Sequence, residues 1–354
     1  MELRKRLVCL VIATFVAGCT ADATTNVSVL YAELDRAAVT PSARVDASGR
    51  VHVVYVKGND LYYSSSGDTG SSFAPAVRVN RRANFAAAGL FRGPELAMGE
   101  DGTIHIVWYN RAWQQDLPRL DYGVMYSRAA AGQPFEPERN LSAGPADGYS
   151  IGVAGNYVTV LWHTDDQLWQ AASSDGGSRF QSQALSAGLP CECCDTAIQV
   201  DRSGEVSIMY RDRTENRRDM FRVNLVAERT GAQKVRLDDD SWIIEACPVS
   251  GADFTRRSGR DVAAWEHRGR ILLATIERDH ASASLPIDLG QGKFPVLALT
   301  EHQLLVAFKS GRTLKWTLRD AATLRQIDSG SVAAQRPDRP AVAPLADGRF
   351  LLFR

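Results

Sequence analysis

Short stretches of alternating hydrophobic and polar residues, each following a glycine turn, recur along most of the chain. The sequences VHVVYV at 51–56, IHIVWY at 104–109 and FLLF at 350–353 are rich in β-branched and aromatic residues. Each follows a turn of Asp or Ser with Gly, at Gly49, Gly102 and Gly348. This pattern is typical of two short strands joined by a tight turn. Because apolar residues at helical spacing are rare, the chain is predicted to be all-β.

The hairpin pattern repeats at a regular interval. A Pro stands eight residues before each of these glycines, at Pro41, Pro94 and Pro340, and a copy without the Pro begins at Asp195. The period of roughly 40 to 55 residues is within the range of the four-stranded blades of β-propellers. Six complete units can be counted, at residues 41–80, 93–140, 146–187, 195–236, 247–289 and 294–327.

Two segments remain outside these six units. They are a two-strand remnant at residues 340–354 and a single strand at Asn26–Leu34. Pairing them would complete a further blade, close the ring and cover the sheet edges that an open ring exposes. The sequence therefore favours seven blades, with six as the alternative, in one propeller domain over residues 26–354.

Two segments, at residues 66–73 and 173–180, share the pattern S-x-D-x-G-x-x-F, and a worn copy lies at 128–135. The defining residues are Ser66, Asp68, Gly70, Phe73, Ser173, Asp175, Gly177 and Phe180. The pattern resembles the Asp box, or BNR repeat, of the sialidase superfamily, where it forms a turn between the third and fourth strands of a blade. The resemblance covers most of the chain and implies a sialidase-like propeller.

The N-terminal residues 1–18 resemble the signal peptide of a bacterial lipoprotein. The basic Arg4–Arg6 precede an apolar stretch, Leu7–Val16, that is too short to span a bilayer as a mature helix. The motif VAGC ending at Cys19 resembles a lipobox, in which the Cys carries the lipid, and residues 19–25 would link it to the propeller. The Thr after Cys19 implies, by resemblance to lipoprotein sorting in Gram-negative bacteria, the outer membrane. Which side of that membrane the protein faces stays open.

The charge balance argues against an electrostatic partner. The chain has 41 Lys and Arg residues and 41 Asp and Glu residues, so its formal net charge is zero. Neither nucleic acid nor an anionic membrane surface is therefore predicted as a partner. The predicted membrane contact is the lipid anchor alone.

The resemblance also implies that two sets of loops share one face of the propeller: those leading into each blade and those between the second and third strands. Charged residues gather in these loops. A single Arg or Asp in a surface loop is most commonly solvated or paired with a neighbour, so a binding site is predicted only from several such residues together. We predict a ligand-binding site at the mouth of the channel formed by Arg92, Arg211, Asp212, Arg218, Asp219 and Arg268.

A sialidase-type reaction is an alternative. FRGP at residues 91–94 resembles the family's FRIP motif, which carries the first of three arginines that hold the substrate carboxylate, and Arg211 and Arg268 could be the others. However, this motif opens the second unit rather than the first, Gly93 replaces the Ile, and the last loops contain no Tyr nucleophile. These departures favour a protein without this activity and leave the enzyme question open.

Besides Cys9 in the signal segment and Cys19, the predicted lipid carrier, four cysteines remain: Cys191, Cys193 and Cys194, within four positions, and Cys247. An extracytoplasmic compartment permits disulfides, and Cys247 is expected to pair with Cys193 or Cys194. The alternative is a metal site, because thiolates suit Cu(I) and Zn(II). The spacing C-x-C-C is unlike that of zinc fingers and favours copper. Histidines that could join the site are His163 and His267. A catalytic thiol is a third hypothesis, although the sequence marks no base for it.

The motifs CxCC, YRDxxxxxRD and CPxxG together resemble a group of bacterial sialidase-like BNR proteins. The sequence thus predicts an envelope lipoprotein that binds a ligand at a face lined by Cys, Arg and Asp. The ligand is a metal ion such as copper, or an anionic or carbohydrate molecule. The alternatives are an exo-sialidase-type glycoside hydrolase and a scaffold for other envelope proteins. The sequence establishes no cofactor; copper is the candidate ion.

Overall fold

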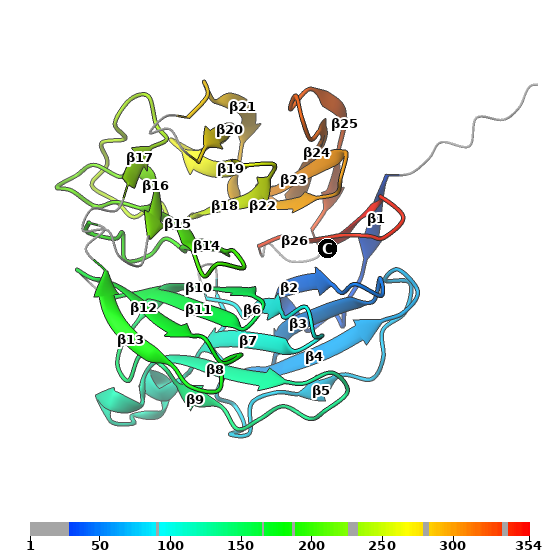
Figure 1. Cartoon of the computed structure of the whole chain (residues 1–354), viewed down its shortest axis with the longest axis vertical. Helices are drawn as coiled ribbons and strands as arrows, with labels where there is room; N and C mark the ends of the chain where they lie inside the picture. The colour runs from blue at the N-terminus through cyan, green and yellow to red at the C-terminus, as the bar shows by residue number, and fades with distance from the viewer. Residues whose placement is uncertain are drawn as a thin grey trace, which may run out of the picture.

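The computed structural model describes residues 28–89, 92–164, 166–185, 188–225, 233–278, 283–334 and 339–354. Its strands form seven sheets around a central channel (Figure 1). The prediction of an all-β propeller is confirmed, with seven blades rather than six. The predicted signal peptide, Cys19 and the linker at 19–25 lie outside the described residues. Within the described ranges, no helix is long and apolar enough to span a membrane.

Six blades are four-stranded antiparallel sheets whose strands follow chain order. Blades 1 to 3 contain β2 (Val39–Val45), β3 (Val51–Lys57), β4 (Asp60–Ser66) and β5 (Val77–Arg78); β6 (Glu95–Met98), β7 (Ile104–Tyr109), β8 (Val124–Ala129) and β9 (Arg139–Asn140); and β10 (Asp147–Ala154), β11 (Tyr157–His163), β12 (Leu168–Ser173) and β13 (Gln181–Leu185). Blades 4 to 6 contain β14 (Ala197–Val200), β15 (Val206–Arg211), β16 (Met220–Leu225) and β17 (Gln233–Arg236); β18 (Ala252–Arg257), β19 (Arg260–His267), β20 (Arg270–Glu277) and β21 (Ile287–Gln291); and β22 (Lys293–Leu299), β23 (Gln303–Ser310), β24 (Thr313–Asp320) and β25 (Gln326–Ala333).

The seventh blade joins the two ends of the described chain. Strands β26 (Ala341–Pro344) and β27 (Phe350–Phe353) form a hairpin, and β1 (Val29–Ala32) adds to β27 in parallel. The first strand of each blade contacts the first strands of both neighbours, and β26 contacts β2, so the ring is closed. The N-terminal strand therefore pairs with the C-terminal remnant, as the sequence predicted.

The core consists of seven apolar clusters, each lying between two neighbouring blades. A blade is covered on both faces, so its middle strands are hydrophobic at consecutive positions rather than at alternate ones. Strands β3 and β7 show this pattern, because nearly every residue in them is buried. Each blade is therefore stabilised mainly by its neighbours.

The two Asp boxes fold as the turns between β4 and β5 and between β12 and β13. In the first turn, Asp68 Oδ1 accepts from the hydroxyl of Ser66 (2.6 Å) and the N–H of Ser72 (2.9 Å). Asp175 makes the equivalent bonds with Ser173 and the N–H of Arg179. Their aromatic residues reach the preceding blade: Phe73 packs on Phe353, and Phe180 packs edge-on against Tyr126. The boxes thus fasten one blade to the next.

The channel is lined by the first strands and is polar. Arg339, which leads into β26, pairs with Asp195 (2.9 Å), across the ring from its own blade. Asp253 on β18 accepts from the N–H groups of Leu297 (2.7 Å) and Phe254 (2.9 Å). Burial raises the pKa of Asp253 to about 6, despite these hydrogen bonds.

Loss of one buried aromatic at the ring closure should weaken the whole propeller. Phe350 on β27 is fully buried between blades 6 and 7. We expect Phe350→Ala to lower the free energy of unfolding by about 3–5 kcal/mol, because the cavity cannot collapse fully. Urea denaturation followed by circular dichroism measures this change. The exposed Ile327→Ala on β25 is the control and should change the free energy by about 0.5 kcal/mol or less. Equal losses in the two variants would contradict the closure role.

The buried carboxyl of Asp253 should make stability depend on pH in a defined window. Its folded pKa of about 6 lies above the unfolded value of about 4, so the folded state binds the proton more tightly. This stabilisation is present below pH ~4 and is lost as the pH rises through ~6, amounting to about 3 kcal/mol at most. Denaturation curves of Asp253→Asn across this window should lack that decline. The exposed Asp328→Asn is the control, and parallel curves for Asp253→Asn and the unmodified protein would refute the assignment.

Candidate functional site

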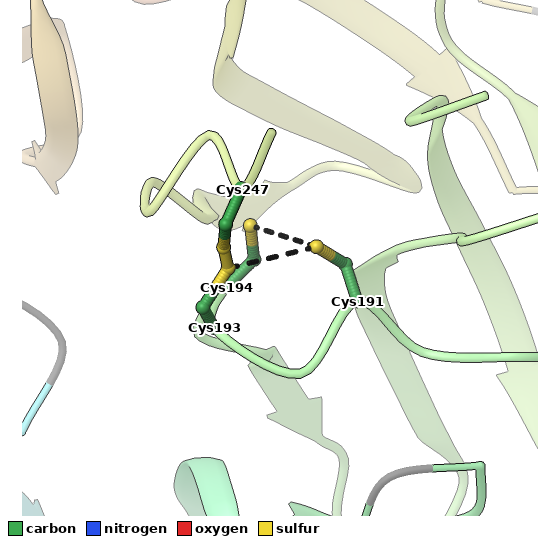
Figure 2. Close-up of side chains that lie close together, drawn as sticks. All are labelled: Cys191, Cys193, Cys194 and Cys247. Atoms are coloured by element: carbon green, nitrogen blue, oxygen red, sulfur yellow. Dashed lines mark hydrogen bonds between the residues drawn. A yellow bond between two sulfur atoms is a disulfide. The ribbon is translucent and has the colours of Figure 1, made fainter. Parts of the chain in front are cut away.

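The loop at residues 190–196 leads into β14 and lies against the end of β15. The N–H of Cys191 donates to the C=O of Arg211 (2.8 Å), and the N–H of Cys194 donates to the C=O of Cys191 (3.1 Å). This turn brings Cys191 Sγ to 3.6 Å from Cys194 Sγ and 3.8 Å from Cys193 Sγ. Figure 2 shows the sulfur atoms turned toward one another.

The fourth sulfur comes from the loop that leads into the next blade. Cys247 forms a disulfide with Cys193, 54 positions away in sequence, with their Cα atoms 6.4 Å apart. The structure thus has one of the two pairings that the sequence favoured, and it leaves Cys191 and Cys194 as free thiols. All four Sγ atoms lie within 4.8 Å of one another. We call Cys191, Cys193, Cys194 and Cys247 the sulfur cluster.

The sulfur cluster has a buried side and an open side. Cys191 and Cys194 are buried, Cys193 is half-buried and Cys247 is exposed. A ligand or reductant from solvent would therefore meet Cys247 and the disulfide first.

The two free thiols have opposite acidities. The thiol of Cys194 donates to Cys191, and this bond, with the charge of Arg211 adding to it, lowers the pKa of Cys191 to about 6 although burial opposes the shift. Burial raises the pKa of Cys194 well above its usual range, and its bond to Cys191 raises it further. The pair therefore shares a single proton near neutral pH, with the negative charge on Cys191.

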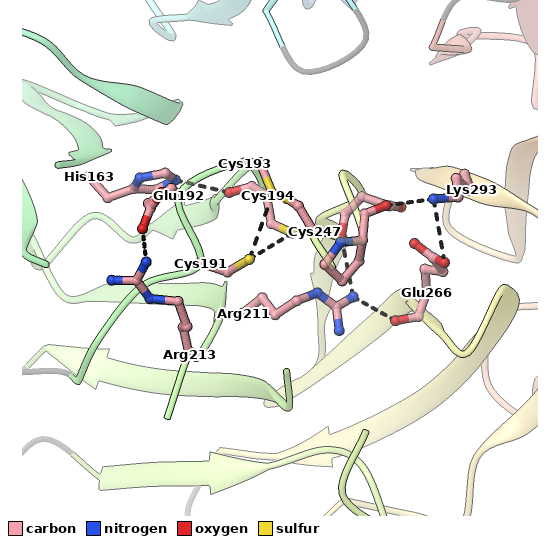
Figure 3. The surroundings of a disulfide bond; sticks show 12 residues. His163, Cys191, Glu192, Cys193, Cys194, Arg211, Arg213, Cys247, Glu266 and Lys293 are labelled. Carbon is pink, nitrogen blue, oxygen red and sulfur yellow. Dashed lines mark hydrogen bonds and ion pairs between the residues drawn. A yellow bond between two sulfur atoms is a disulfide. The ribbon is translucent and has the colours of Figure 1, made fainter. Parts of the chain in front are cut away.

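Arg211, at the end of β15, supplies the positive charge beside the sulfur cluster (Figure 3). Its Nη1 donates to the C=O of Arg218 (2.7 Å), and its Nη2 donates to the C=O of Glu266 (2.6 Å) and of Ser250 (3.2 Å). The guanidinium stacks on Trp242 at 5.1 Å. Arg211 is almost fully buried, and no carboxylate of the described chain lies within 4.0 Å of it.

Two aspartates hold the loop that carries Cys247. Asp219 accepts from the N–H of Trp242 (3.0 Å) and the hydroxyl of Ser241 (3.0 Å). Asp238 accepts from the N–H of Met220 (2.6 Å) and the indole N–H of Trp265 (2.7 Å). These bonds tie the loop to blades 4 and 5 and so fix the position of Cys247.

The other charged residues predicted around the cluster each have protein partners. Asp212 accepts from the hydroxyl of Thr214 (2.6 Å) and lies 3.4 Å from Lys234 Nζ. Arg218 donates to the backbone of its own loop, and Arg268 pairs with Asp240 (2.7 Å). These three residues therefore shape the loops of this face.

Arg92 lies apart from the sulfur cluster, in a pocket between blades 2 and 3. Its guanidinium forms two hydrogen bonds with Asp147, at 2.6 and 2.7 Å, and stacks over Tyr109. The cavity has a volume of about 370 Å³. Its wall includes Trp113, which lies on the short 3-10 helix η1 (Ala112–Gln115), and the loop continues through η2 (Arg119–Asp121). His163 and Glu192 also line it and connect it to the cysteine loop.

The histidines considered as further ligands do not join the four sulfurs. His163 Nε2 lies 3.1 Å from the C=O of Cys194, and His267 lies between the carboxylates of Asp238 and Asp240. The group of candidate ligand atoms among the described residues contains sulfur alone.

Sequence reasoning also missed several residues that build the site. They are Glu192 and its ion-pair partner Arg213, Asp238, Trp242 and Ser250. The run of three aspartates at 238–240, just before the Cys247 loop, was the one visible signal.

The comparisons with known proteins identify the fold. No family model matches the chain, and no curated protein matches it in sequence. Similar solved structures include α-L-arabinanase of Penicillium chrysogenum complexed with arabinobiose, with 10% identity over 82% of this chain and 95% of that chain at a TM-score of 0.53. A mutant of NanB sialidase from Streptococcus pneumoniae has 9% identity over 84% and 68% of the two chains at 0.52. Hydrazine synthase of Kuenenia stuttgartiensis has 12% identity over 89% and 92% at 0.55. At these identities the likeness shows a sialidase-like propeller fold and nothing finer.

The disulfide should be found at one defined pair in protein purified in air. We expect non-reducing peptide mass spectrometry to show Cys247 linked to Cys193, with Cys191 and Cys194 modified by alkylation after unfolding. Fragmentation between Cys193 and Cys194 assigns the bond, and the Cys193→Ser variant provides the comparison. A native bond from Cys247 to Cys194, or four free thiols, is the result that rules out this pairing.

Proposed function

We propose that this protein is a lipid-anchored envelope protein whose sulfur cluster binds one soft metal ion, copper(I) first and zinc as the alternative. The observation that carries the proposal is the convergence of four Sγ atoms within 4.8 Å from two separate loops. Thiolates prefer Cu(I) and Zn(II) over hard ions such as Mg²⁺ or Ca²⁺.

The spacing between sulfurs supports this proposal. A tetrahedral site with metal–sulfur bonds of about 2.3 Å has sulfurs about 3.8 Å apart. Cys191 Sγ lies 3.6 Å from Cys194 Sγ and 3.8 Å from Cys193 Sγ. The turn at residues 191–194 therefore already places Cys191 Sγ at separations from two other sulfurs that suit one ion.

The charge around the cluster also favours a metal–thiolate group. Burying a cation without a countercharge is unfavourable, and Arg211 is buried with only carbonyl groups as hydrogen-bond partners. Thiolates bound to Cu(I) or Zn(II) carry net negative charge, which a neighbouring guanidinium would stabilise. Arg211 is accordingly assigned to stabilising the charge of the loaded site rather than to ligating the metal.

The oxidation state of Cys193 and Cys247 would decide whether the site can load. While the disulfide is present, two of the four sulfurs are not thiolates, and the site can offer two ligands at most. Reduction by an external thiol would supply the other two. The metal-binding form is thus the reduced form.

The alternative of a sialidase-type hydrolase has less support from the geometry. Each of its three candidate arginines has a protein partner: Arg92 binds Asp147, Arg211 binds carbonyl groups and Arg268 binds Asp240. A substrate carboxylate would have to displace these partners.

Reduced protein should bind one equivalent of Cu(I) per chain. Anaerobic titration against a coloured Cu(I) chelator, followed by elemental analysis, measures stoichiometry and affinity. The double variant Cys191→Ser/Cys194→Ser should lose about 100-fold in affinity or more, because it removes two ligands where loss of an outer partner alone costs about 10–100-fold. Glu245→Gln, on the exposed loop beside Cys247, is the matched control and should bind normally.

The same titration of disulfide-bonded protein should show much weaker binding. If the reduced protein binds one equivalent of zinc but no copper, the proposed ion is wrong and the proposed binding site is retained. The proposal fails if reduced protein binds neither ion, or if the double variant binds as tightly as Glu245→Gln.

A further inference from the structure

The described chain buries three arginines, and one of them has no compensating charge. Arg211 lies beside the sulfur cluster, and Arg222 pairs with Asp261 at 2.8 Å. Arg319, on β24 of blade 6, forms no ion pair within 4.0 Å with a described carboxylate. Its Nη1 donates to the C=O of Leu324 (2.8 Å), and its Nε has no hydrogen-bond partner. Only 7% of this residue is exposed.

This arrangement is unfavourable unless something else supplies negative charge. Buried cations in proteins are normally paired, because an isolated one loses its hydration without replacement. Burial accordingly lowers the pKa of Arg319. A buried guanidinium that has an unpaired donor and no carboxylate beside it is therefore a candidate contact for an anion.

Arg319 lines a cavity of about 360 Å³ between blades 5 and 6. Alternation along β24 places Lys315, Thr317 and Arg319 on one face of the strand. The hydroxyl of Thr317, a residue only 6% exposed, also lines this cavity and has no partner. Arg319 and Thr317 thus line the same cavity, and each keeps one buried donor atom, Nε and Oγ1, without a hydrogen-bond partner.

Polar residues of the neighbouring strand complete the wall. In the register of β25, Ser331 stands opposite Lys315 and Ser329 stands opposite Thr317. Gln326 stands opposite Arg319. The outer strands of both blades lie at the rim of the ring in Figure 1, away from the channel. Gln326, Ser329 and Ser331 line the cavity and are exposed, so the cavity opens at this rim.

One carboxylate lines the cavity, and it is already engaged. Asp288 on β21 accepts from Arg270 at 2.5 Å through Oδ2 and from the N–H of Gly290 at 2.8 Å through Oδ1. It therefore neutralises Arg270 rather than Arg319. Lys315 adds a second positive charge at the exposed side of the same strand face.

We propose that this cavity is a binding site for a tetrahedral oxyanion, a phosphate or sulfate group, with Arg319 and Thr317 as its principal donors. Arg guanidinium groups bind such anions through strong charge-assisted hydrogen bonds, and a hydroxyl adds a neutral one. The group could belong to a free small molecule or to the headgroup of a membrane lipid. The site is separate from the sulfur cluster and does not depend on its metal.

The test measures binding of inorganic phosphate and sulfate by thermal shift and calorimetry at constant ionic strength, with chloride as the reference salt. Both anions should raise the melting temperature of the unmodified protein. Arg319→Gln should abolish the increase, corresponding to a loss of affinity of about tenfold or more. Arg325→Gln, which removes an equal charge from an exposed residue of the same blade, should keep it.

A second readout guards against simple misfolding of the variant. Without phosphate, Arg319→Gln should melt no lower than the unmodified protein, because it removes a buried charge that lacks a partner. Thr317→Val, close in volume to the native residue, should weaken phosphate binding several-fold while leaving Arg319 in place.

Sedimentation with vesicles distinguishes the two sources of the anion. Binding to vesicles of an anionic phospholipid but not of phosphatidylcholine, lost in Arg319→Gln and kept in Arg325→Gln, supports a lipid headgroup. Binding of free phosphate with the same variant pattern supports a soluble ligand. The proposal is overturned if neither phosphate, sulfate nor anionic vesicles bind, or if binding is equal in the two arginine variants.

Discussion

Closure of the ring is the constraint on which the other features of this protein depend. Each blade buries its apolar faces against two neighbours, so a blade at an open end would expose a whole face. Addition of β1 to β27 removes that end, because it completes the last blade with a segment more than 300 positions away in the chain. Once the ring is closed, the loops leading into blades 4 and 5 have fixed neighbours. That is why sulfurs 54 positions apart can lie within one bond of each other.

The charged residues of the cysteine face act mainly by positioning loops. Asp219 and Asp238 each accept two hydrogen bonds that hold the loop carrying Cys247. Arg211 joins three backbone carbonyl groups from three different segments. Carboxylates and guanidinium groups can satisfy several backbone groups at once, which suits them to loops that lack a regular ladder. The sequence predicted Arg211 and Asp219 as ligand contacts, and in the structure both hold loops in place. Asp238 does the same, although the sequence did not single it out.

The fold could be predicted from the sequence further than the site could. The interval between Pro41, Pro94 and Pro340 and the aromatic ends of the Asp boxes determine the blades, because those features report local turns and strand faces. The closure by β1 followed from counting strands. The partners of Arg92 and Arg211 could not be read in the same way, because Asp147, Ser250 and Glu266 lie in other blades. Nothing in the chain near either arginine marks its partner. The choice of Cys193 over Cys194 for the disulfide likewise depends on how a four-residue turn orients its sulfurs.

The three buried arginines of the described chain show different ways of compensating a buried positive charge in the same ring. Arg222 satisfies it inside the protein, through Asp261. Arg211 has carbonyl dipoles, an aromatic face, an acidic thiol and the more distant carboxyl of Glu266 around it, so ionisation or metallation of sulfur adds to its countercharge. Arg319 has a single carbonyl and a cavity. A buried charge without compensation lowers the stability of the fold. Arg211 and Arg319 therefore become more favourable when a negative group lies beside them. The sulfur cluster and the cavity between blades 5 and 6 do not touch, but the same electrostatic requirement applies to both. Each therefore favours a negatively charged ligand group of its own.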